Sequence, residues 1–143
     1  MAEEFVLGFQ AKTYWGPSGA QASNELTNMQ DNELSLENGE TDITTRATNG
    51  WRAFAPTLTE AGVEFKMLWR PGDAGFEAVK DAFLQKSSIA LLVLDKVIGE
   101  GEGLDADFII SNFTRSEPLE EALTVDVTAR ITVSDRAPEW VTP

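Results

Sequence analysis

The sequence contains no cysteine and no histidine, and these two absences exclude many kinds of active site. Without cysteine there is no disulfide framework and no thiolate nucleophile. Without either residue there is no zinc site of the usual ligand set and no imidazole base. Basic residues are also scarce, with 11 Lys and Arg against 24 Asp and Glu and a formal net charge of −13. Because tight phosphate binding needs a surplus of basic side chains, this balance argues against a protein that binds DNA by charge attraction.

Long hydrophobic runs are missing as well. The longest, residues 89–94, is far too short to cross a bilayer, and the acidic start Met1-Ala2-Glu3-Glu4 lacks the basic segment of a secretory signal. We therefore expect a protein made in a cytoplasm. A chain of 143 residues with 42% hydrophobic content suits one domain that spans residues 1–143.

Alternation of apolar and polar residues predicts a mainly β chain. The pattern is clearest in residues 123–133 and in residues 62–69, where Val63, Phe65 and Met67 alternate with charged residues. Residues 5–15 also alternate, which predicts that Leu7 and Phe9 face inward. The Asn-Gly pairs at 38–39 and 49–50 favour tight turns. The other expected strands are residues 29–36, 41–48, 51–58 (an edge strand, because of Pro56), 88–97 (buried on both faces) and 104–113.

One helix is predicted over residues 75–86. Asp73 is suited to cap its start, and Phe76, Val79 and Phe83 form an apolar stripe at helical spacing. Residues 16–28 are polar and hold one large apolar side chain, Leu26, so they are expected to form a long surface loop or arm. These elements predict an antiparallel β-sandwich or barrel of about seven or eight strands with one flanking α-helix.

Catalytic signatures are weak, and we expect no enzyme. Carboxylates cluster in residues 100–107, but only Asp105-x-Asp107 fits the calcium-loop pattern, so a solvated acidic turn is the usual explanation. Trp51 and Trp140 lie outside the apolar faces of the expected strands, which suits a subunit contact or a sugar platform. An alternative function is therefore a monomeric acidic β-sandwich that binds carbohydrate, calcium or both.

Several segments together resemble the major tail (tail tube) proteins of tailed bacteriophages. The most specific strings are Thr41-Asp-Ile-Thr-Thr-Arg46 and Phe113-Thr-Arg-Ser-Glu-Pro-Leu-Glu-Glu121, and the resemblance extends from about Leu7 to Trp140. The remaining segments that carry it are residues 34–40, 49–52, 65–69 and 78–83.

The resemblance implies a structural subunit of a virion tail. Such subunits form hexameric rings that stack into a hollow tube, in which one sheet from each subunit joins a continuous β-barrel around the lumen. Double-stranded DNA passes through without specific binding, and an acidic lumen suits this role because it repels phosphate. The implied partners are further copies of the chain and other tail components (tape measure, tip or baseplate, terminator), with no membrane.

Particular residues are expected to carry these roles. No catalytic, cofactor-binding or metal-binding residue is expected, and residues 16–28 would reach toward an adjacent ring. The candidates are Asp31, Glu33, Asp42, Asp105 and Asp107 for the lumen, Ser18, Leu26 and Thr27 for the inter-ring arm, and Trp51 and Trp140 for subunit contacts.

Overall fold

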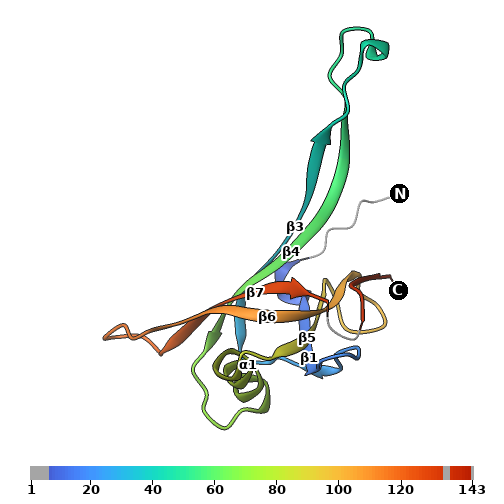
Figure 1. Cartoon of the computed structure of the whole chain (residues 1–143). Coiled ribbons are helices and arrows are strands. Elements are labelled where there is room, and N and C mark those ends of the chain that lie inside the picture. The colour runs from blue at the N-terminus through green and yellow to red at the C-terminus, as the bar shows by residue number, and fades with distance from the viewer. Residues whose placement is uncertain (1–6, 134–135, 143) are drawn as a thin grey trace.

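In a computed structural model, the chain forms one curved antiparallel sheet of eight strands with one α-helix packed against it (Figure 1). The structure describes residues 7–133 and 136–142. The strand order is β2-β1-β5-β6-β7-β4-β3, and β8 pairs with β6. The mainly β, antiparallel class with one helix is confirmed, but a single sheet contains all of the strands in the described ranges. The elements are β1 (Lys12–Pro17), β2 (Asn24–Glu25), β3 (Met29–Asp42), β4 (Phe54–Leu68), α1 (Ala74–Gln85), β5 (Ser88–Leu94), β6 (Gly103–Ser116), β7 (Thr124–Thr132) and β8 (Glu139–Val141), with short 3-10 turns at Gly8–Gln10 and Arg46–Thr48.

The main core lies between α1 and one face of the sheet. The alternation predicted for residues 62–69 is confirmed, with Val63, Phe65 and Met67 of β4 buried. In residues 123–133 it is confirmed for Val125 and Val127 of β7, but β7 ends at Thr132 and Val133 is 69% exposed. The two strands pair directly, so these side chains pack side by side. Burial of each such side chain contributes about 1.5–3 kcal/mol to the stability of the folded subunit.

Helix α1 begins and ends within one residue of the prediction. Asp73 caps its start by accepting a hydrogen bond from the Phe76 amide at 3.1 Å, and Lys86 ends it in a left-handed conformation. Phe76 and Val79 are fully buried, and the Phe76 ring meets the Trp69 ring edge-on at a centroid distance of 4.9 Å. The helix is therefore fixed to the sheet by its apolar stripe, as the sequence indicates.

Strand β5 is buried on both faces, as predicted. Residues Ile89, Leu91 and Val93 face the main core, whereas Ala90, Leu92 and Leu94 join a second core with Tyr14 and Ala22. The strand ends at Leu94, three residues before the predicted end, because the chain turns there and the Asp95 carboxylate accepts a hydrogen bond from the Glu102 amide at 2.8 Å.

The prediction of a strand over residues 5–15 is confirmed only from Lys12 onward. Residues 8–10 form a 3-10 turn, β1 starts only at Lys12, and Phe9 is 79% exposed. Residues 5 and 6 lie outside the described residues. The inward side chain is instead Tyr14, whose hydroxyl accepts a hydrogen bond from the Ile98 amide at 2.9 Å. Trp15 packs against the main core as the alternation indicates, but Tyr14 is buried in the second core, so β1 contacts a core on each side.

Strands β3 and β4 form one long hairpin that projects from the body (Figure 1). A turn at Asn38-Gly39 was predicted and is wrong: β3 runs through this pair with only a shift in register. Gly39 instead makes room for the neighbouring strand, because a Cβ atom at this position would lie only 2.6 Å from Thr57 Oγ1. The reversal at Asn49-Gly50 is confirmed, with φ of 53° and 79°. Pro56 lies in the outer half of β4, which pairs with β3 alone, so it has the edge position that proline requires.

Candidate functional site

The projecting hairpin carries several large apolar side chains that are about half exposed or more. An isolated two-stranded ribbon gains little stability by itself, so exposed apolar groups on it need another explanation. Contiguous apolar surface on a soluble protein usually marks a contact with another molecule. These side chains are Leu36, Ile43, Trp51, Phe54 and Leu58, of which Trp51 is 77% exposed.

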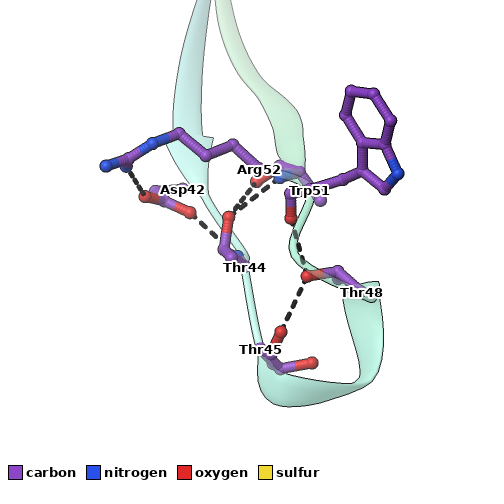
Figure 2. A network of polar contacts seen from close by, with 7 residues as sticks. Asp42, Thr44, Thr45, Thr48, Trp51 and Arg52 are labelled. Atoms are coloured by element: carbon purple, nitrogen blue, oxygen red, sulfur yellow. Dashed lines mark hydrogen bonds and ion pairs between the residues drawn. The ribbon is translucent and has the colours of Figure 1, made fainter.

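The tip of the hairpin is held in one shape by a network of threonines (Figure 2). The Thr45 hydroxyl accepts a hydrogen bond from the Ala47 amide at 3.2 Å, and the Thr44 hydroxyl accepts one from the Ala53 amide at 2.8 Å. The Thr48 hydroxyl lies 2.7 Å from the carbonyl oxygens of both Thr45 and Trp51. The Trp51 ring points away from this network (Figure 2). A partner would therefore meet a preorganised tip, which lowers the entropy lost on binding.

Asp42, one of the candidate lumen residues, belongs to this tip. Its carboxylate accepts a hydrogen bond from the Thr44 amide at 2.8 Å and lies 3.5 Å from the Arg52 guanidinium (Figure 2). Hydrogen bonds from the Thr44 side chain and then from its backbone favour the charged form and lower the pKa of Asp42. Asp42 thus joins the two sides of the tip.

Asp31 and Glu33 lie on an acidic face, which is the side of β3, β4 and β7 turned away from the main core. Register places Glu33 opposite Glu64, and Glu37 opposite Glu60. Like charges directly opposite one another destabilise a sheet, so folding of the subunit alone does not account for them. The acidic face comprises six exposed carboxylates, Asp31, Glu33, Glu37, Glu60, Glu64 and Asp126, and two basic residues, Lys66 and Arg130.

Asp105 and Asp107, expected to line a lumen, are instead buried, at 3% and 1% exposure. Arg136 donates to both, with Nη1 2.8 Å from Asp105 and Nε 3.2 Å from Asp107. Burial alone would lower the pKa of Arg136, but hydrogen bonds to the two carboxylates raise it overall. The Gly19 amide also donates to Asp107 at 3.1 Å. These carboxylates therefore tie β6 to two other segments and are not presented at the surface.

The acidic turn offers no calcium site in the described part of the chain. Asp105 and Asp107 bind a guanidinium, and no group of three or more possible metal-ligating side chains occurs among residues 7–133 and 136–142. Nor is any helix in these ranges long and apolar enough to cross a membrane.

The segment expected to be an arm folds against its own subunit. Leu26 is only 5% exposed and joins the main core, and its amide donates to the Thr13 carbonyl at 2.9 Å. The Ser18 hydroxyl lies 2.6 Å from that of Ser88, whereas Thr27 is exposed. A Cβ atom on Gly75 would lie 2.6 Å from Leu26 Cδ1, which shows how closely the segment approaches α1. The element that projects is the β3-β4 hairpin.

Replacing Leu26 with alanine is expected to lower the free energy of unfolding by about 2–5 kcal/mol, because it leaves a cavity in the main core beside α1. Urea unfolding of the purified subunit measures this change. Thr27→Ala is the matched control and is expected to stay within about 0.5 kcal/mol of the parent protein, since Thr27 is exposed. Unchanged stability of Leu26→Ala together with impaired assembly would restore the arm interpretation.

The two candidate contact tryptophans lie in different settings. Trp140, on β8, is half exposed, and its indole Nε1 donates to Glu102 at 2.7 Å. Trp51 lies at the hairpin tip, far from the C-terminal strand (Figures 1 and 2). The two rings therefore do not form one sugar-binding platform.

Comparisons with known proteins agree with this architecture. A family model described as phage tail tube protein matches residues 7–133. Among solved structures, the tail of an empty gene transfer agent (GTA) particle, refined with C6 symmetry, aligns with a TM-score of 0.75 at 13% identity, over 95% of this chain and 98% of that one. The SPP1 tail tube aligns with a TM-score of 0.70 at 18% identity, over 88% and 75% of the two chains.

A third structure, the baseplate of the anti-feeding prophage, aligns with a TM-score of 0.60 at 6% identity, over 99% of this chain and 97% of that one. No curated protein matches in sequence. At these identities the structural likeness shows the fold alone, whereas the family model covers most of the sequence itself. The chain belongs to the phage tail tube protein family.

Proposed function

We propose that this protein is a structural subunit without catalytic activity whose hexameric rings stack into a tail tube that conducts DNA. Two features of the surface support the proposal: one sheet face is acidic and polar, and a hairpin with exposed apolar side chains projects beyond the body (Figure 1). Neither feature contributes to the folding of a single subunit, so both point to a role in an assembly. The C6 symmetry of the similar GTA tail supports rings of six.

The acidic face is the surface that we place around the lumen. Asp31 and Glu33 belong to it, whereas Asp42 lies at the tip and Asp105 and Asp107 are buried. Carboxylates around a bore repel the phosphates of double-stranded DNA. Because the face has few basic side chains to replace the counterions of DNA, we expect DNA to pass without binding tightly.

β3 is the last strand of the sheet, and its outer edge has no partner among the described strands. Pairing of this edge with a neighbouring subunit would continue the sheet around the bore and protect it from uncontrolled aggregation.

The hairpin is the element that we assign to contacts between subunits, in place of residues 16–28. Its apolar side chains would be buried against another copy, as is typical of anchors in the centre of an interface. Ser18 and Leu26 contact their own sheet, and Trp140 is hydrogen-bonded to Glu102. The tape measure, terminator and tip or baseplate remain proposed partners, and the fold similarity to a baseplate structure supports the last of these.

Negative-stain electron microscopy of the purified protein over a range of concentrations tests the proposal. Rings or hollow tubes are expected above a threshold concentration. If only single particles appear at every concentration, both with and without preformed tail tips as nuclei, the proposal fails, and binding of sugars becomes the next function to test.

Charge reversal on the acidic face is expected to make assembled tubes bind DNA. The triple variant Glu33→Lys, Glu64→Lys and Asp126→Lys changes the charge of each subunit by six units, and the new cations would bind phosphates with an affinity that falls steeply with salt. A matched control carries the same change at exposed acids elsewhere, in Asp81→Lys, Glu100→Lys and Glu121→Lys. Retention of labelled DNA inside tubes is the measurement. Equal retention by both variants would show that the acidic face does not line the bore.

A further inference from the structure

The outer part of the β3-β4 hairpin connects two regions that are each held in place, the tip and the body of the subunit (Figure 1). In the body, β4 lies between β3 and β7, but from Phe54 to Ala61 it pairs with β3 alone among the described strands. At the tip, the threonine network and the Asp42–Arg52 contact fix the shape of the loop (Figure 2). The position of the tip therefore depends on a ribbon of only two strands.

Backbone pairing is interrupted within this ribbon. One residue of β3, Gly39, faces two residues of β4, Thr57 and Leu58, so the register shifts at this point. Such a bulge leaves one residue unpaired and bends the strand that carries it. Glycine also loses more backbone freedom on ordering than any other residue, which weakens a strand that contains it. The ribbon is therefore easiest to bend beside Gly39.

Side chains at the same level add one repulsive pair. Glu37 lies directly opposite Glu60, and neither carboxylate forms an ion pair or hydrogen bond in the part of the chain that the structure describes. Like charges directly opposite one another destabilise a strand pair. A hollow of about 300 Å³ lies beside the two carboxylates and Gly39, so packing is open there. Against these features stands a hydrogen bond that the Thr59 hydroxyl donates to Asn38 Oδ1 at 2.6 Å.

We propose that residues 37–40 and 57–60 form a hinge, that repulsion between Glu37 and Glu60 loosens it in the free subunit, and that the resulting mobility of the tip holds back assembly. The last part rests on the tube function proposed above and concerns how that assembly is regulated. A site that is in its binding-competent position only part of the time binds with an affinity reduced by that fraction. A loose hinge therefore raises the concentration at which free subunits assemble.

Distances between spin labels test the hinge in the free subunit, since a chain without cysteine accepts labelled thiols at chosen sites. Two samples carry Asp81→Cys on the exposed side of α1, paired either with Ala47→Cys at the tip or with Ser35→Cys on the body side of the hinge. Double electron–electron resonance is measured below the assembly concentration. The distance distribution to the tip is expected to be roughly twice as wide as that to residue 35, or wider. Equal widths would overturn the hinge.

Exchange of charges tests the cause of the mobility. Glu37→Lys places a cation opposite Glu60, and is expected to narrow the tip distribution and to lower the concentration needed for assembly about threefold. Glu37→Lys combined with Glu60→Lys restores a like-charge pair and is expected to return both values to those of the parent protein. An effect of net charge alone would instead grow from the single to the double variant, because each exchange adds two positive charges to a formal charge of −13.

The outcomes separate the hinge from the function on which its regulatory role rests. A steady change through the single and double variants overturns the charge pair as the cause and leaves the tube function intact. A narrower distribution in Glu37→Lys without a lower assembly concentration overturns the regulatory role. If the parent protein forms no tubes, even with preformed tail tips as nuclei, the tube function and its regulation both fail, and the spin-label distances still decide whether the hinge exists.

Discussion

Replacing Arg136 with methionine is expected to lower the free energy of unfolding by about 3–5 kcal/mol. The substitution removes the only cation that the described structure places against Asp105 and Asp107, while both carboxylates stay buried in β6. It also releases the segment that leads into β8. Urea unfolding followed by tryptophan fluorescence would measure the loss.

Two further variants separate charge from packing at this site. Asp105→Asn and Asp107→Asn, combined with Arg136→Met, are expected to recover much of the lost stability, since no uncompensated charge remains buried. Arg136→Lys keeps the charge but cannot donate from Nε and Nη1 together, so an intermediate loss is expected. A loss below about 1 kcal/mol in Arg136→Met would contradict a structural role for this cluster.

Replacing Trp51 with alanine is expected to weaken assembly without changing the stability of the subunit. Truncation of an exposed anchor that becomes buried at an interface costs about 2–3 kcal/mol of binding free energy. The concentration needed for tube formation should rise roughly 30-fold or more. Sedimentation of tubes across a concentration series measures this threshold, and thermal unfolding measures the subunit.

Leu119→Ala is the matched control, because Leu119 is fully exposed but lies in a different turn. A more severe variant replaces residues 43–53 by Asn-Gly. Asp42 and Phe54 are directly paired, so a two-residue turn can join them without altering the register. This variant is expected to fold and to form no tubes. Normal tubes from it would remove the hairpin tip from the assembly contacts.

Predictions from the sequence succeeded where local pattern determines structure. Helix α1 has its cap, its apolar stripe and its end signal within one short stretch, and β7 pairs with strands on both sides, so its alternation translates directly into burial. The Asn38-Gly39 turn failed because pairing along the whole of β3 and β4 outweighed a local turn preference. A local sequence pattern does not show how far two strands will pair, so it could not predict that strand pairing would override the turn.

The candidate site was predictable only in part, since it depends on contacts distant in sequence. Asp31 and Glu33 are exposed on β3, as their position on the polar face of the expected strand indicated, and their place in a lumen stays a prediction. The burial of Asp105 and Asp107 depends on Arg136, 31 and 29 residues away, so alternation alone could not indicate it. Leu26 was misassigned because its neighbours are small and polar, although they allow the segment to pack closely on α1. Trp51 was singled out because it did not fit any apolar face; it is exposed, and its role as a contact residue stays a prediction.

The outer half of the hairpin is a ribbon that no third strand of the described sheet flanks, since β4 pairs with β7 only from Gly62 onward. Such a ribbon opens locally at low free energy, so its backbone amides in the free subunit should exchange with solvent far faster than those of β5 or β7. The threonine hydrogen bonds hold the shape of the tip itself, but the two strands that carry the tip still open, so the first contact that fixes these strands bears the cost of ordering them. The first contacts between free subunits are therefore expected to form more slowly than later ones. A preformed surface that holds the ribbon of the first subunits in place would then determine where a tube begins.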